Sequence, residues 1–336
     1  MKEPNFPIDF VVSWVDGSDP KWLRKKSKYQ SNLVVDRHDP FNSSIRYREY
    51  GLFKFWFRSV EKNAPWVRNI YLVTDNQIPD FLNLNNSKII IVDHMDIINH
   101  KYLPTFDSNT IDLNIFKIKG LSNHFVYFND DFYINNPVVK SDFFTEDGFS
   151  RDTIGQSIIM PIESYDHNIV NNTIKVNQII KKKKLLMNQA KNFFSLNQGF
   201  EVFLLNIMLA VFPRFTRLFD PHTAYSINKS DMSDAIDVLG EELSKAFSKP
   251  FRSLDDYTIQ FIRYFQILKN HSRPRKKGFG ETADSNNVRH IQNILFKKRH
   301  VKIINVNDNE TASEKDLKNI TNLFEKKFPN KSSFEK

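Results

Sequence analysis

Four short apolar runs, at residues 8–15, 69–74, 88–92 and 125–128, each end abruptly in polar residues. Runs of this length, rich in Val, Ile, Tyr and Phe and closed by turn formers, are typical of buried strands. The intervals between them are long enough for helices, and this alternation predicts βαβ units. The pattern therefore predicts an α/β fold with a mostly parallel, Rossmann-like sheet flanked by helices.

The remaining periodicity predicts further helices and one late strand. Helices are expected from residue 21, over the aromatic segment 53–61, around Asp112, and over 200–212, 231–247 and 314–328, with a strand at 302–306. The lysine-, serine- and asparagine-rich stretch 142–197 is interpreted as a solvated or mobile insert, and 273–277 as an exposed basic run. We expect an α/β core at 1–145, an inserted, mainly helical region at 146–300, and a C-terminal strand and helix at 301–336 that complete the core.

The polar residues that end the strands are the first candidates for chemistry. They include Asp16-Gly17-Ser18-Asp19, Asp75-Asn76-Gln77 and Asn129-Asp130-Asp131. Carboxyl ends of parallel strands meet at one edge of a sheet, where acids can hold a divalent metal on a substrate phosphate. Glycine and short polar side chains also let backbone N–H groups approach a nucleotide. The alternative is that these residues form turns and caps without any ligand.

Composition and charge narrow the class of partner. The 336 residues carry a net charge of +9, which favours anionic partners such as nucleotide sugars, phosphorylated polymers, nucleic acid or an acidic membrane. Cysteine is absent, which excludes disulfides and thiolate metal sites and is compatible with the cytoplasm. The N-terminus lacks the features of a signal peptide, and the apolar stretch 202–212 is shorter than the ~20 residues that span a bilayer. We expect a soluble protein that is at most peripherally associated with a membrane.

Two loops and one basic segment carry further candidates. His222 lies in the loop Phe219-Asp220-Pro221-His222, and Arg252 lies in a second loop after Pro250. Arg46 precedes the aromatic segment, where arginines could bind phosphate through two parallel hydrogen bonds or could form a solvated basic face. A single histidine in a loop usually has no chemical role, so spacing alone does not assign one.

Taken in order, these segments resemble the four conserved blocks of the Stealth family of sugar-1-phosphate transferases. That family includes bacterial capsule polymerases and the lysosomal-enzyme N-acetylglucosamine-1-phosphotransferase. The first block corresponds to IDFVVSWVDGSDP, and the second to RSVEKNAPWVRNIYLVTDNQIP, IVDHMDI, LPTFDSNTID and GLSNHFVYFNDDFYI. FDPHTAYSINK with PFRSLDDYTIQF represents the third, and VNDN with FPNKSSFE the last. Asp112 stands where the family usually has Glu.

The resemblance implies a reaction in which an acceptor hydroxyl attacks the β-phosphorus of a UDP-sugar, forming a phosphodiester and releasing UMP. It implies His222 as general base, Arg252 as the group that stabilises charge on phosphorus, and Asp112 as an orienting acid. Asp131, Asn307 and Asp308 would hold Mg²⁺ or Mn²⁺. Residues that would border the donor or acceptor are Asp16, Gly17, Ser18, Asp19, Arg46, Asp75, Asn76, Gln77, Asn129 and Asp130.

The implied setting is capsular or cell-surface polysaccharide synthesis, with a glycan acceptor and no nucleic acid. The place would be the cytoplasm, including the inner face of the membrane beside the capsule machinery. Two alternatives stay open at this level. One is a metal-dependent glycosyltransferase that attacks the anomeric carbon and releases UDP. The other is a basic protein that binds nucleic acid or anionic polysaccharide without turnover, for which the basic runs 181–184 and 273–277 would form the contact surface.

Overall fold

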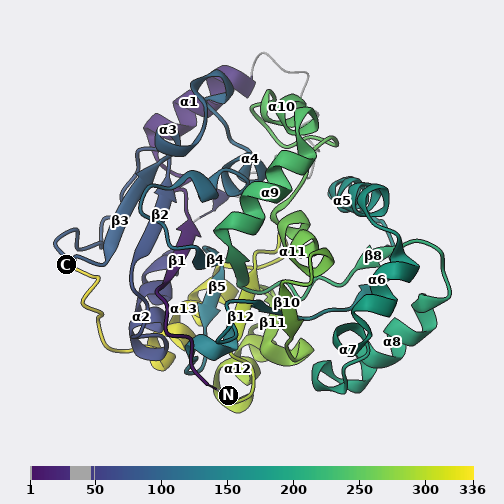
Figure 1. Ribbon diagram of the computed structural model, residues 1–336. Coiled ribbons are helices and arrows are strands. Elements are labelled where there is room, and N and C mark those ends of the chain that lie inside the picture. The colour runs from purple at the N-terminus through teal and green to yellow at the C-terminus, as the bar shows by residue number, and fades with distance from the viewer. Residues whose placement is uncertain (1, 31–46, 49) are drawn as a thin grey trace.

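A five-stranded sheet forms the centre of the computed structural model, which describes residues 2–30, 47–48 and 50–336 (Figure 1). The strand order is β3-β2-β1-β4-β9, and only β9 runs antiparallel to its neighbour. Its strands are β1 (Ile8–Ser13), β2 (Ile70–Thr74), β3 (Ile89–Asp93), β4 (His124–Asn129) and β9 (Tyr225–Asn228). The predicted α/β class, with a mostly parallel sheet, is confirmed.

The register places the polar strand ends along one edge of this sheet. Ser13, at the end of β1, lies opposite Asn129 of β4 and Val73 of β2. Thr74 in turn lies opposite Asp93 of β3. The loops after these four strands therefore leave the sheet on the same side, as expected from parallel strands.

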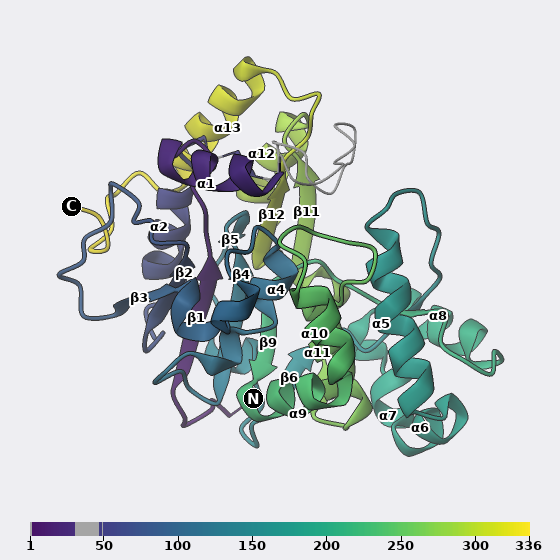
Figure 2. The ribbon, with the colours of Figure 1, turned by 90° about the horizontal axis from the view of Figure 1, so that it is seen from above.

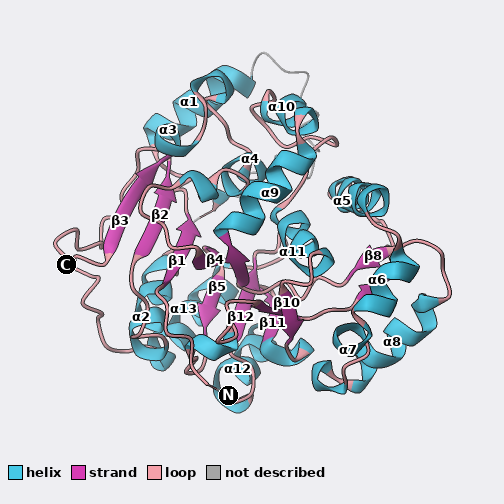
Figure 3. Cartoon of the chain, viewed as in Figure 1, coloured by secondary structure: helices cyan, strands magenta, loops and turns pink. Residues whose placement is uncertain are grey.

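Both faces of the sheet are covered, which explains why the strands read as nearly continuous apolar runs. Along β1, Phe10 and Val12 point into one core, which includes residues of α2 (Phe53–Asn63), α12 (Val288–Lys297) and α13 (Glu314–Lys327). Val11 points into the other, which includes residues of α9 (Lys229–Leu239) and α11 (Ile259–Leu268). Strands lie in the middle and helices outside (Figure 3).

A smaller sheet continues from β4 and pairs the last strand of the chain with a strand from its first half. β5 (Phe132–Ile134) pairs antiparallel with β12 (Ile303–Asn307), which pairs parallel with β11 (Gly280–Asp284). α13 begins at a capping box in which Ser313 and Asp316 satisfy each other's backbone N–H groups. The predicted late strand and final helix are confirmed.

The middle of the chain is mainly helical and packs against the sheet. Its helices are α5 (Asp166–Ile179), α6 (Lys182–Asn188), α7 (Ala190–Phe193), α8 (Phe200–Ala210), α9, α10 (Glu241–Phe247) and α11, and its short strands are β6 (Ser150–Asp152), β7 (Gln156–Ser157), β8 (Arg217–Leu218) and β10 (Ser272–Pro274). Seen from above, α5 to α8 lie on the side away from β3 (Figure 2). Because β9 and β11 also come from residues 146–300, the core and the predicted insertion share both sheets.

Two expectations for this region were wrong. The stretch 142–197 is not a solvated insert, because Asn172 is fully buried and Lys182 donates from its buried Nζ to the Arg214 carbonyl at 3.2 Å. The run 273–277 is not wholly exposed, because Arg275 is buried. Polar side chains that find internal partners can be buried, and composition does not reveal those partners.

Three further helices follow the strands at the polar edge of the sheet or lie between them in the chain. They are α1 (Pro20–Gln30), α3 (His94–Ile97) and α4 (Ser108–Asp112). None of the helices in the described ranges is long and apolar enough to cross a membrane.

Candidate active site

The loop after β1 is clamped by one amide side chain. Gln77 accepts a hydrogen bond from the Asp16 N–H at 2.9 Å and donates to the Asp16 carbonyl and the Asp19 carboxylate at 3.0 and 3.1 Å. The Gln77 hydrogen bond is also the main reason that the pKa of Asp19 lies below its ordinary value. Ser18 donates to Asp16 through both its N–H and its hydroxyl. The loop is therefore held in one shape without a ligand.

Gly17 is required by the packing of this loop. A Cβ atom at this position would lie 2.0 Å from the Tyr47 carbonyl oxygen. The Tyr47 hydroxyl donates to the Phe106 carbonyl, and the Phe106 ring stacks on Phe251 with 5.1 Å between centroids. These contacts connect the loop after β1 to the segment that carries Arg252.

In the loop after β2, Asp75 and Asn76 have structural roles in an ion pair and a turn. Asp75 forms an ion pair with Lys25 of α1, with N–O distances of 2.6 and 2.8 Å. Asn76 has a φ of 54°, a left-handed turn conformation that asparagine tolerates. The predicted substrate contacts of Asp75 and Asn76 stay predictions, and Arg46 lies outside the described residues.

Asp131 lies in an oxygen-rich corner that β12 completes. The Asn305 amide donates to Asp131 Oδ2 at 2.6 Å, across the pairing of β5 with β12. Asp131 Oδ1 and Asn305 Oδ1 are buried, and neither accepts a hydrogen bond from the described residues. Burial raises the pKa of Asp131, and the neighbouring His222 ring and Asn305 amide oppose part of that rise.

Asp308 shares this corner and contributes a second carboxylate. Its charge also raises the pKa of Asp131, so the two groups are electrostatic neighbours. Arg48 holds Asp308 with two hydrogen bonds, at 2.8 and 2.6 Å, and the Ser285 hydroxyl donates to it at 3.2 Å. Asn307, predicted with Asp308 as a metal ligand, is exposed at the end of β12.

The oxygen donors of this corner suit a hard divalent cation such as Mg²⁺ or Mn²⁺. Within the described ranges, no three His, Cys, Asp or Glu side chains come together as a complete protein-made metal site. Mg²⁺ needs only one or two carboxylates, because substrate phosphates and water supply its other oxygen ligands. The two buried oxygens without donors, on Asp131 and Asn305, fit that requirement.

The backbone of His222 is held by Asp220, which belongs to a buried ion-pair network. Its φ is 43°, and its N–H donates to Asp220 Oδ1 at 3.0 Å. Burial alone would raise the pKa of Asp220, but the charges of Arg263 and His222 outweigh that effect and lower it. Arg263, which is fully buried, also binds Asp152 of β6 with two hydrogen bonds of 2.8 Å. The His222 ring packs edge-on against Phe132, the residue after Asp131.

Asp112 is the last residue of α4, and Arg252 contacts the first turn of the same helix. Asp112 Oδ1 accepts from the Tyr127 hydroxyl at 2.6 Å, and burial raises the pKa of Asp112 to about 7. Arg252 donates to the Ser108 hydroxyl at 2.5 Å, and its Nε lies 3.9 Å from Asp107, which caps the helix. The Arg252 charge opposes part of the rise in the Asp112 pKa, so the two side chains are close enough to interact.

The remaining strand-end residues border this group. Asn129 ends β4, and Asp130 is half-buried; burial and the Asp112 charge chiefly raise the pKa of the Tyr127 hydroxyl, and the Asp130 charge adds to that rise. The structure thus brings Asp112, Asp131, His222 and Arg252 to one edge of the sheet, together with Asp308. Sequence reasoning missed Asn305, Asp220 and Tyr127 as supporting residues. The only local signals were an asparagine within an apolar strand and an acid two residues before His222.

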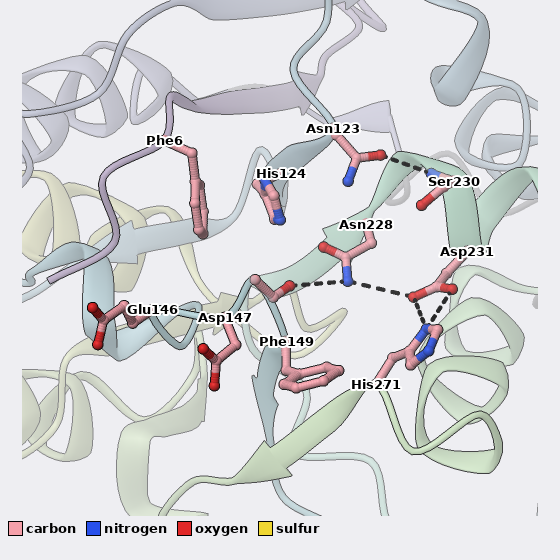
Figure 4. A pocket seen from close by; sticks show the side chains of 11 residues that line it. Phe6, Asn123, His124, Glu146, Asp147, Phe149, Asn228, Ser230, Asp231 and His271 are labelled. Atoms are coloured by element: carbon pink, nitrogen blue, oxygen red, sulfur yellow. Dashed lines mark hydrogen bonds and ion pairs between the residues drawn. The ribbon is translucent and has the colours of Figure 1, made fainter. Parts of the chain in front are cut away.

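A separate hollow of about 360 Å³ lies at the opposite end of β4 (Figure 4). Its lining includes His124, Asn228 and the pair in which Asp231 binds His271 Nδ1 at 2.8 and 3.0 Å. His124 begins β4, whereas Asp131 follows its end, so this hollow is not part of the group around Asp131.

Comparisons with known proteins place the chain in a family. Residues 6–34 match Stealth protein CR1, conserved region 1, and residues 46–152 match Stealth protein CR2, conserved region 2. The exopolysaccharide phosphotransferase cps2G of Lactiplantibacillus plantarum is 42% identical over 98% of this chain and 97% of its own. The chain belongs to the Stealth family. The family membership predicted from the sequence motifs is confirmed.

Further relatives of this Stealth protein have similar names. The capsular polysaccharide phosphotransferase WcwK of Streptococcus pneumoniae is 38% identical over 98% of each chain. The receptor polysaccharide phosphotransferase WefC of Streptococcus oralis is 34% identical over 98% of this chain and 99% of its own. Among solved structures, the galactosyltransferase LgtC aligns over 95% of each chain with a TM-score of 0.43 and 11% identity.

Proposed function

We propose that this Stealth protein is a polysaccharide phosphotransferase that moves a sugar-1-phosphate group from a UDP-sugar to an acceptor hydroxyl. The acceptor oxygen forms a bond to the β-phosphorus, and the bond from that phosphorus to the oxygen bridging the two phosphates breaks. UMP leaves with the bridging oxygen, and the product is a phosphodiester. The enzyme class is that of the relatives' names, and the proposal adds the donor, the leaving group and the residues.

One observation carries the proposal. Two pairs of side chains from segments far apart in the chain lie at the carboxyl edge of a parallel sheet: Asp131 with His222, and Asp112 with Arg252. Phosphoryl transfer depends mainly on positioning and on charge neutralisation, and this group supplies both. A protein that only binds polyanions would gain nothing from buried carboxylates at that edge.

We assign roles from these contacts. No described residue makes a hydrogen bond to the His222 ring, so the ring is free to accept the acceptor proton. The fixed backbone of His222, held by Asp220, keeps the ring beside Asp131. Arg252, anchored by Ser108, would face the transferring phosphate, and Asp112 would orient the sugar or the acceptor. The loop of residues 16–19 would border the nucleotide.

Asp131 and Asp308 are the residues that would hold a divalent cation, with Asn305 beside them. Mg²⁺ bound there would neutralise the negative charge of the diphosphate. We place the enzyme in the cytoplasm and its product in a capsular or cell-surface polysaccharide. The cysteine-free composition is compatible with that location.

The test is to identify the nucleotide that is released. The purified protein is incubated with Mg²⁺, a panel of UDP-sugars and capsular oligosaccharide acceptors, and the products are analysed by chromatography and ³¹P NMR. UMP together with a new phosphodiester supports the proposal. UDP with no phosphodiester would overturn it in favour of glycosyl transfer, and salt-sensitive binding without turnover would leave only a polyanion-binding protein.

Variants then test the assigned roles. His222→Ala and Arg252→Ala should each reduce turnover by roughly 10³-fold or more, because each removes a group acting on the reacting atoms. His300→Ala and Arg299→Ala are matched controls, since both residues are exposed and precede β12, at the end of that strand opposite Asn307. Wild-type rates in either test variant would remove that residue from its role.

A further inference from the structure

The outward face of α8 is apolar and uncovered. Six exposed side chains form what we call the α8 surface: Phe200, Leu204, Ile207, Met208, Val211 and Phe212. Phe200 is 69% exposed and Val211 80%, which is unusual for residues of this size. A contiguous exposed apolar area of this kind marks an interaction site in folded proteins.

Four residues of this surface, Phe200, Leu204, Ile207 and Met208, lie on one side of α8, and Val211 and Phe212 directly follow the helix end at Ala210. Val202, Asn206 and Leu209 are buried and lie on the side facing the protein. The helical residues of the α8 surface lie on the opposite side and are mostly spaced by three or four positions. A helix that packs on one side normally presents polar residues on the other, but the outward side of α8 is mostly apolar, with Glu201 as its one exposed charged residue.

The segments around α8 also expose large apolar side chains. Between residues 158 and 212 lie thirteen of the twenty-two large apolar side chains that are exposed in the described part of the chain. They include Met187 of α6 and Leu196, which are 71% and 63% exposed. The helices α6, α7 and α8 lie together at the same corner of the molecule (Figure 1). The apolar exposure is therefore concentrated in one lobe.

Basic side chains accompany this apolar lobe. Residues 181–214 contain six Lys and Arg and one acid, Glu201, whose carboxylate is paired with Lys277 at 2.6 Å. Lys181, Lys183, Lys184, Lys191 and Arg214 are exposed. A surface that combines apolar residues with unopposed lysines matches an anionic lipid headgroup layer above a hydrocarbon layer.

We propose that the α8 surface docks this protein on anionic membranes, with α8 lying in the plane of the interface. Eleven residues span only about 16 Å as a helix, too short to cross the bilayer but suited to lying flat in it. A second copy of the chain is a poorer occupant, because symmetric pairing would bring the same lysines of α6 together. The inference concerns a surface away from the active site and does not depend on the proposed reaction.

The test measures binding of the full chain to vesicles by flotation. Vesicles of phosphatidylcholine with about 30% phosphatidylglycerol are compared with pure phosphatidylcholine, at low and high salt. We expect binding to the anionic vesicles that weakens as salt rises, because the lysine contribution is screened. Wild-type protein that stays unbound to the anionic vesicles would overturn the proposal.

Two pairs of variants separate the apolar and charged contributions. Phe200→Gln with Val211→Gln should lower partitioning on the order of tenfold or more, because both apolar side chains leave the interface. Lys183→Gln with Lys184→Gln should lower it roughly tenfold on anionic vesicles only. The matched controls are Leu84→Gln with Val139→Gln, and Lys315→Gln with Lys318→Gln, which change exposed residues outside the lobe. Equal effects in tests and controls would contradict the assignment.

A cysteine reporter gives a second, spectroscopic readout of the same surface. Since the chain has no cysteine, Val211→Cys can be labelled at one position with an environment-sensitive fluorophore. Its emission should shift to the blue on anionic vesicles, whereas a label at Val139→Cys should not shift. A blue shift at residue 211 that appears without vesicles and grows with protein concentration would instead show self-association, and would overturn the membrane assignment.

Discussion

Asp112 is a residue whose charge state depends strongly on its surroundings. It is 6% exposed and receives a hydrogen bond from Tyr127, yet burial still raises its pKa from an ordinary 3.8 to about 7. Between these two pH values the native state holds a proton that the unfolded chain has released. Stability therefore falls as the pH rises from about 4 to about 7, since the native state binds more protons than the unfolded state.

Asp112→Asn should remove this pH dependence. The variant should unfold like the wild type at pH 4, and by pH 8 it should be the more stable of the two by up to about 4 kcal/mol, the equivalent of the pKa shift. Urea denaturation across that pH range measures the difference. Asp237→Asn, at an exposed position on α9, is the control and should show no such gain. A constant offset at all pH values would mean that Asp112 is not buried as a proton-holding acid.

At the scale of elements, the strands were predictable and the supporting contacts were not. The runs at 8–15 and 125–128 predict β1 and β4, because strands that are buried on both faces are apolar along nearly their whole length. By contrast, Asn172 belongs to the interior because its amide donates to the Thr258 hydroxyl at 2.7 Å, a partner 86 residues away. Asn305 reaches Asp131 only through strand pairing. Such contacts leave no local signal in the sequence.

The loop after β1 gives an element-scale prediction. Gly17→Ala should push Tyr47 away and loosen the loop, because the new Cβ would overlap a backbone oxygen. We expect a loss of about 1–3 kcal/mol in unfolding free energy. We also expect a KM for the donor raised on the order of tenfold, measured by steady-state kinetics. Gly278→Ala is the control, because its nearest neighbour would lie 3.9 Å away. Unchanged donor KM in Gly17→Ala would argue against a nucleotide-bordering role for this loop.

At the scale of the whole molecule, α2 is tied to the last residues of the chain. The Arg58 guanidinium donates to the Glu335 carboxylate at 2.9 Å and to the Phe328 carbonyl at 3.0 Å. Burial alone would raise the pKa of Glu335, but the hydrogen bonds and charge of Arg58 together with the Ser332 hydrogen bonds outweigh burial and lower that pKa. The ion pair should therefore contribute stability above the ordinary glutamate pKa and lose it as the pH falls.

Arg58→Ala should cost about 3 kcal/mol of unfolding free energy near neutral pH, because it leaves the buried Glu335 unpaired. Adding Glu335→Ala should recover part of that loss, so a double-mutant cycle by chemical denaturation should show clear coupling. Lys54→Ala is the matched control, since its pair with Glu325 is partly exposed at 3.7 Å and should be worth less than 1 kcal/mol. Additive effects of the two Arg58 and Glu335 changes would rule out the pair as a tether.

The pairing of Asp131 with Asn305 also sets an order of events during synthesis. These two residues are 174 positions apart, and Asp308 follows three residues later. A ribosome that has made the sheet, the His222 loop and Arg252 has still not made β12. A nascent chain therefore cannot assemble the corner around Asp131 until nearly all of it has left the ribosome, and interrupted translation products should be inactive even when their sheet has folded.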